Sequence, residues 1–140
     1  MKNQSLLFTL KCSVIIYFAA CSSIDKLGVS HTISQQLVAK KAWKVNCFGT
    51  TAADNTCIFE GYAFNFDATG KVTAIKNGSN IEGNWLEDNI SKKITLNFKD
   101  KNGVLSQLNF YWDIATISDA GITFEKNSNL DSEKLYITAL

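Results

Sequence analysis

Residues 59 to 85 read FEGYAFNFDATGKVTAIKNGSNIEGNW. Tyr62, Phe64 and Phe66 alternate with smaller or polar residues, which is the period of a β-strand with one buried face. The next four residues, 67–70, read Asp-Ala-Thr-Gly and predict a turn. Asp can accept hydrogen bonds from its own backbone there, and Gly tolerates a positive φ.

The same stretch contains a second turn and two more strands. Residues 72–75 form a run rich in β-branched side chains, and Asn77-Gly78 is typical of the tight turns that join antiparallel strands. Ile81, Gly83 and Trp85 then alternate on the return. The stretch therefore predicts a three-stranded antiparallel meander.

The rest of the chain continues in short strands. The alternation of Trp43, Val45 and Cys47 predicts a first strand over 43–48, in which these three residues share one face. Further strands are expected from residue 57 and over 94–98, 105–116, 122–124 and 135–140, with a turn at 100–103. About eight short strands with regular turns predict an all-β fold, an antiparallel up-and-down barrel.

The aromatic residues are expected inside this barrel. An eight-stranded barrel is just wide enough for side chains, or for one small ligand. The sequence leaves open whether the interior is filled or hollow. The candidate interior residues are Trp43, Tyr62, Phe64, Phe66, Trp85, Trp112 and Phe124.

The N-terminal residues 1–20 have the features of a targeting segment. Lys2 and Lys11 supply positive charge, and the apolar run 12–20 is too short to span a bilayer, which needs roughly twenty apolar residues. The run ends in Phe-Ala-Ala-Cys at 18–21, which resembles the lipobox of bacterial lipoproteins. This resemblance implies cleavage before Cys21 and lipid attachment to it. An ordinary secretory signal is the alternative.

The predicted lipoprotein signal divides the chain into three parts. They are a signal peptide at 1–20, a tether with a short helix at 21–41, and the barrel at 42–140. Ile33, Leu37 and Val38 fall near helical spacing in the tether. Ser22 follows the lipid-bearing Cys where Asp would signal retention, and by resemblance to enterobacterial lipoproteins this implies the outer membrane.

Four cysteines remain to be assigned. With Cys12 removed and Cys21 acylated, Cys47 and Cys57 are left, and outside the cytoplasm such a pair predicts a disulfide. Closing a loop of about ten residues would contribute roughly 2–3 kcal/mol. Two free thiols are the alternative.

Charge and motifs exclude several classes of function. All positive charge is Lys; without residues 1–20, twelve Lys stand against thirteen acidic residues, so nucleic acid is not an expected partner. The carboxylates Asp54, Glu60, Glu82 and Asp113 are scattered, and His31 is the only His. No catalytic site, cofactor or metal site is therefore predicted.

Several motifs together resemble a known group of proteins. They are Trp-Lys-Val at 43–45, the segment 59–66, Gly-Lys-Val at 70–72, Gly-Asn-Trp at 83–85, Leu-Asn-Phe at 96–98, and Trp-Asp-Ile at 112–114. The pattern resembles the small lipocalin-like lipoproteins of Bacteroidetes. This resemblance implies a lipocalin-like barrel in the cell envelope and carries over no catalytic residues.

Two functions follow from these expectations. The first is a membrane-anchored, non-enzymatic module that binds a small apolar or amphipathic ligand at the barrel mouth. The alternative is an envelope structural or protein-interaction lipoprotein with a filled barrel. The volume of the interior distinguishes the two.

Overall fold

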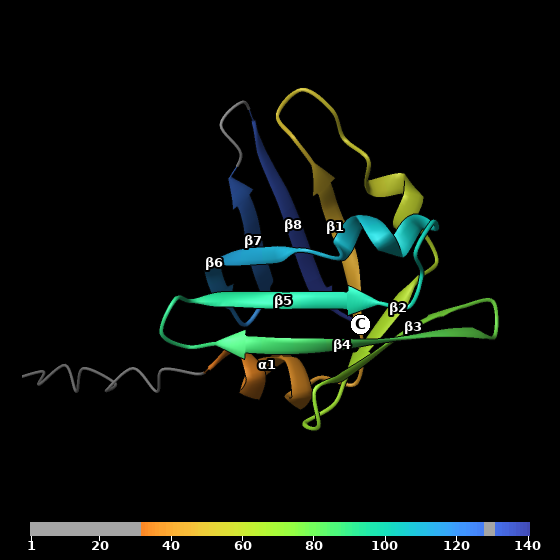
Figure 1. Ribbon diagram of the computed structural model, residues 1–140, viewed down its shortest axis with the longest axis horizontal. Helices are drawn as coiled ribbons and strands as arrows, with labels where there is room; N and C mark the ends of the chain where they lie inside the picture. The colour runs from red at the N-terminus through yellow and green to blue at the C-terminus, as the bar shows by residue number, and fades with distance from the viewer. Residues whose placement is uncertain (1–31, 128–130) are drawn as a thin grey trace, which may run out of the picture.

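The computed structural model describes residues 32–127 and 131–140. Eight strands form one closed barrel in which each strand is antiparallel to the next and β8 returns to β1 (Figure 1). The predicted all-β up-and-down barrel is confirmed. The strands are β1 (Trp43–Gly49), β2 (Ala63–Phe66), β3 (Lys71–Lys76), β4 (Ser79–Asp88), β5 (Lys93–Phe98), β6 (Tyr111–Ser118), β7 (Gly121–Asn127) and β8 (Ser132–Ala139).

The predicted meander forms β2, β3 and β4. The β3–β4 turn has positive φ at both central residues, 50° at Asn77 and 78° at Gly78, which is the geometry that suits a tight hairpin. In the β2–β3 turn, the Asp67 carboxylate accepts hydrogen bonds from the Thr69 and Lys71 amides. Local turn chemistry therefore sets the register of this part of the sheet.

The first strand departs from the predicted alternation. The β1–β8 register shifts between Val45 and Cys47, so β1 contains a bulge. An extra residue reverses which face each later side chain takes. Phe48 is consequently buried and Cys47 exposed, the reverse of the prediction for this end of the strand.

Two short 3₁₀ helices replace strand segments that the sequence predicts. The segment η1 (Thr56–Phe59) contains Cys57, which was expected to open the second strand. The segment η2 (Val104–Leu108) contains Leu105 and Leu108, which were expected in a strand leading to Trp112. Both leucines are buried, so they add to the core from a helix.

Helical segments close both ends of the barrel. The short helix α1 (Ile33–Ala39) precedes β1 and lies at the end that holds the β2–β3, β4–β5 and β6–β7 turns; η1 and η2 lie at the other end (Figure 1). Ile33 and Leu37 of α1 are fully buried. The indole of Trp43 donates a hydrogen bond of 3.0 Å to the Leu37 carbonyl, which ties α1 to β1.

Candidate functional site

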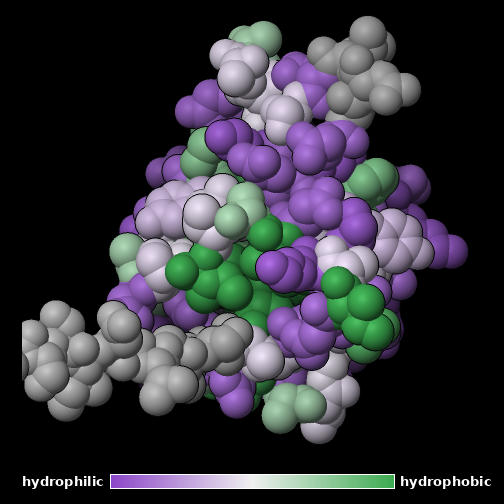
Figure 2. All heavy atoms as spheres, turned by 90° about the vertical axis from the view of Figure 1, so that its left-hand side faces the viewer, coloured by the Kyte–Doolittle hydropathy of each residue, from purple (hydrophilic) through white to green (hydrophobic). Residues whose placement is uncertain are grey.

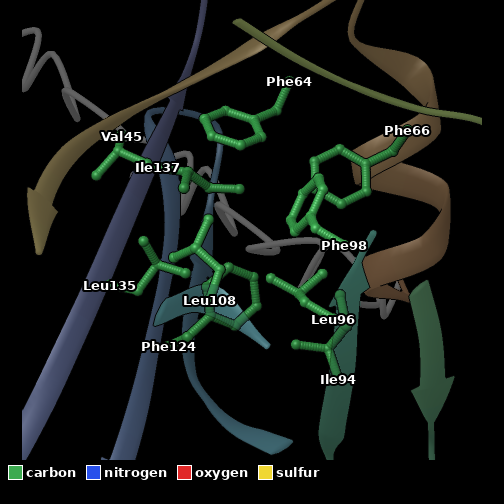
Figure 3. A pocket seen from close by; sticks show the side chains of 10 residues that line it. All are labelled: Val45, Phe64, Phe66, Ile94, Leu96, Phe98, Leu108, Phe124, Leu135 and Ile137. Carbon is green, nitrogen blue, oxygen red and sulfur yellow. The ribbon is translucent and has the colours of Figure 1, made fainter. Parts of the chain in front are cut away.

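The barrel interior is filled with side chains. Its cavity measures about 10 Å³, the room for roughly one water molecule. Apolar side chains from opposite walls converge on this space (Figure 3). The residues around it are Val45, Phe64, Phe66, Ile94, Leu96, Phe98, Leu108, Phe124, Leu135 and Ile137.

Most of the predicted interior residues lie in this core. Tyr62 is half-buried and packs against the edge of the core, with the Lys76 ammonium 4.6 Å from its ring centre. The others are at most 7% exposed: Trp43, Phe64, Phe66, Trp85, Trp112 and Phe124. The core includes three aromatic residues absent from the predicted set, Phe48, Phe59 and Phe98. Phe48 and Phe59 pack edge to face with ring centres 4.9 Å apart.

The two cysteines of the predicted disulfide are exposed free thiols, so this bond is not formed in the structure. The prediction assumed that Cys47 ends one strand and Cys57 begins the next. The bulge instead turns Cys47 outward, and Cys57 lies in η1. The predicted lipid attachment residue, Cys21, lies outside the described residues.

Of the scattered carboxylates, Asp54, Glu82 and Asp113 take part in local structure, and Glu60 is exposed. Hydrogen bonds from Thr56 lower the pKa of Asp54. Hydrogen bonds from Lys71 and Lys99 lower the pKa of Glu82, and Lys93 lies 2.5 Å from Asp113. Among residues 32–127 and 131–140, no three His, Cys, Asp or Glu side chains gather closely enough to hold a metal ion.

In the described part of the chain, the junction with the fewest paired positions lies between β1 and β2. These strands pair at a single position, Trp43 opposite Phe64, whereas β1 pairs with β8 from Trp43 to Gly49. The strands diverge beyond that position, and a groove of about 370 Å³ opens between them. We call this the seam groove; its residues are Lys44, Val45, Asn46, Phe59, Glu60, Gly61, Tyr62, Ala63 and Leu140.

A second groove, of about 280 Å³, runs between the start of α1 and β6. It contains Ile33, Ile114 and Ile117, and the nearby β4–β5 turn carries Ile90, which is 97% exposed. On this side of the molecule, hydrophobic residues gather in the middle of a largely hydrophilic face (Figure 2). Within the part of the chain that the structure describes, no helix is long and apolar enough to cross a membrane.

The seam groove was not predicted. Sequence periodicity indicated that both flanking segments are strands, and it carried no signal that the strands separate. The bulge in β1 lies beside the groove, and η1 forms from residues that the sequence predicted as the start of the second strand.

Comparisons with known proteins give one informative match. No family model matches the sequence, and no curated protein matches it. Among solved structures, a crystal structure from Bacteroides vulgatus, described as a DUF4847 family protein, is similar with a TM-score of 0.53. The two share 14% identity over 74% of this chain and 95% of the other. This chain is therefore similar in fold to a Bacteroides protein, and at this identity the likeness extends to the fold alone.

Proposed function

We propose that this protein is a non-enzymatic interaction module of the cell envelope, held at the membrane by a lipid on Cys21, whose filled barrel presents a rigid surface to another protein. The observation that carries the proposal is the interior of about 10 Å³. Sites for small molecules typically enclose about 300 Å³ or more. Of the two functions expected from the sequence, the filled barrel favours the protein-interaction function over the binding of a small ligand.

Closure of both ends adds support. Trp43 joins β1 to α1, and the Trp112 indole donates a 3.0 Å hydrogen bond to the Leu108 carbonyl of η2 at the opposite end. In the described part of the chain, every buried side-chain nitrogen or oxygen has a hydrogen-bond partner. A ligand entering the barrel would have to displace closely packed side chains whose polar groups are already hydrogen-bonded. Binding on the outer surface requires no such displacement.

The anchor is tested by metabolic labelling with a fatty-acid analogue. We expect the wild-type protein to incorporate the label and Cys21→Ala to lose it. Equal labelling of the two, or none in either, would contradict the anchor.

The partner class is tested by native mass spectrometry of the protein purified from its own host. We expect a protein complex of defined stoichiometry that persists through purification, with no small molecule on the free chain. A recurrent small-molecule adduct on the monomer, without a protein partner, would contradict the proposal and favour the ligand-binding function.

A further inference from the structure

Among the described residues, the strand pairing of the barrel is sparsest at the seam groove, with one paired position against three or more at the other junctions. β2 pairs with β3 along its whole length, from Ala63 to Phe66, yet pairs with β1 only at Phe64. At the far end of β1, the connecting loop takes over: Phe48 donates to the Thr56 hydroxyl and accepts from the Asn55 amide, each at 2.8 Å. The part of β1 between these two points faces the groove.

The backbone of Val45 points into this opening. The Ala42 carbonyl accepts a hydrogen bond from the Leu140 amide, so Ala42 faces β8. Residues along an antiparallel strand direct their backbone groups to alternate sides, so Lys44 faces β8 and Val45 faces the seam. β2 supplies no pairing partner opposite Val45 in the described chain. An exposed strand edge of this kind is a template for another backbone.

We infer that the seam groove binds a short extended segment of a partner protein, which lies along β1 and adds its backbone to the free edge. The inference rests on the proposed function and names the kind of partner. Backbone hydrogen bonds would give affinity, and pockets for alternate side chains would give selectivity.

The groove suits a peptide by size and chemistry. From Lys44 to Cys47 the edge spans about 10 Å at about 3.3 Å per residue, enough for three or four residues. Tyr62 and Leu140 provide apolar contact, and Leu140 is 66% exposed.

The rim adds two charges of opposite sign. Lys44 on β1 and Glu60 after η1 are both exposed, and neither belongs to an ion pair within residues 32–127 and 131–140. A short segment with polar or charged flanks matches this rim. A whole strand from a second copy of the chain would be longer than the stretch of β1 between Lys44 and Cys47.

The test uses two substitutions on the outer face of β2. Phe64 and Phe66 point inward, so Ala63 and Asn65 point outward, but only Ala63 borders the groove. Ala63→Trp fills the groove, whereas Asn65→Trp places the same side chain two residues away. Neither change enters the core, and matching thermal melts would confirm that both variants fold.

Phage-displayed random linear peptides are selected against detergent-solubilised full-length protein, and the enriched peptides are synthesised. We expect binding to Ala63→Trp to be weaker by about tenfold or more, and binding to Asn65→Trp to stay within about twofold of wild type. Hydrogen exchange should show added protection of the Val45 amide, which faces the groove, when peptide is bound. Failure to enrich any peptide, equal loss in both variants, or protection only elsewhere would overturn the inference.

A further outcome separates this inference from the proposed function. If the host complex seen by native mass spectrometry forms equally well with Ala63→Trp, the partner binds elsewhere. The seam groove is then rejected, and the interaction function stands.

Discussion

The three tryptophans each join a strand to a helix or turn through the indole N–H. Trp43 and Trp112 donate to helix carbonyls at the two ends of the barrel, and Trp85 donates to the Asp67 carbonyl in the β2–β3 turn at 3.1 Å. Their rings fill the core while the polar edge satisfies a backbone group that packing would otherwise isolate. Single residues therefore provide both core volume and end closure.

Replacing Trp43 by Phe tests this double role. We expect the free energy of unfolding to fall by about 1–3 kcal/mol, because the Leu37 carbonyl loses its partner. Urea unfolding measures the change. Tyr111→Phe is the control, since Tyr111 is 65% exposed and its loss of a hydroxyl should cost less than about 0.5 kcal/mol. Equal stability of Trp43→Phe and wild type would show that the indole bond is unimportant.

At the scale of elements, α1 depends on the barrel for its stability. It has seven residues, whereas isolated helices shorter than about 12–15 residues are marginal in water. Thr32 caps it locally, and the Glu87 carboxylate of β4 accepts hydrogen bonds of 3.0 Å from the amides of both Ile33 and Ser34. A negative group at this end also complements the helix dipole.

Removing that carboxylate should loosen the helix. We expect Glu87→Ala to lower the free energy of unfolding by about 1–3 kcal/mol, and to speed hydrogen exchange in α1 more than in β4. Asn84→Ala, an exposed change on the same strand, serves as the control. If exchange in α1 is unchanged, Glu87 does not hold the helix.

Gly83 decides how closely β4 approaches β5. A Cβ at this position would lie 2.7 Å from the Asn97 carbonyl oxygen and 2.9 Å from the Phe98 Cα, so backbone would have to move. We expect Gly83→Ala to destabilise the barrel by about 1–3 kcal/mol through overpacking. Thermal unfolding measures this, again against Asn84→Ala. Unchanged melting would mean that the two strands separate at little cost.

At the scale of the whole molecule, charges lie outside a wholly apolar core. Among the described residues no polar or charged residue is buried. Glu82 bridges Lys71 and Lys99, and hydrogen bonds from Thr69 and Lys71 lower the pKa of Asp67. The pKa of Asp88 is lowered by hydrogen bonds from Ser91 and Ile90. The outer surface therefore contains several carboxylates stabilised in their charged form.

These shifts predict the direction of pH dependence. A carboxyl with a lower pKa in the folded state adds stability above its unfolded pKa, near 4, and loses it as the pH falls through the folded pKa. We expect the free energy of unfolding to be nearly constant around pH 7 and to fall progressively below about pH 5. Urea titrations at a series of pH values measure this, and Glu82→Gln should flatten part of the decline. A free energy of unfolding that is constant down to pH 3 would contradict the lowered pKa values of these carboxyls in the folded state.

The sequence by itself determined the strands and turns of the meander and its inward residues Phe64, Phe66 and Trp85, whereas Tyr62 lies before β2 and is only half-buried. The alternation at Phe64 and Phe66 identifies the buried face of a strand, because only one face of the sheet packs on the core. Asn77-Gly78 determines a tight turn through the backbone preferences of those two residues alone. Local sequence preferences of this kind match the local structure of the folded chain. They were sufficient to predict the all-β barrel.

Only the tertiary structure decided the bulge in β1, the two 3₁₀ helices and the seam groove. Closing a ring of eight strands couples Val45 to Ile137, far apart in sequence, and a one-residue slip there moved Phe48 inward and Cys47 outward. The partner of α1, Glu87, is likewise more than fifty residues away from it. No local pattern encodes such contacts, because they depend on how the interior volume is filled once the ring has closed.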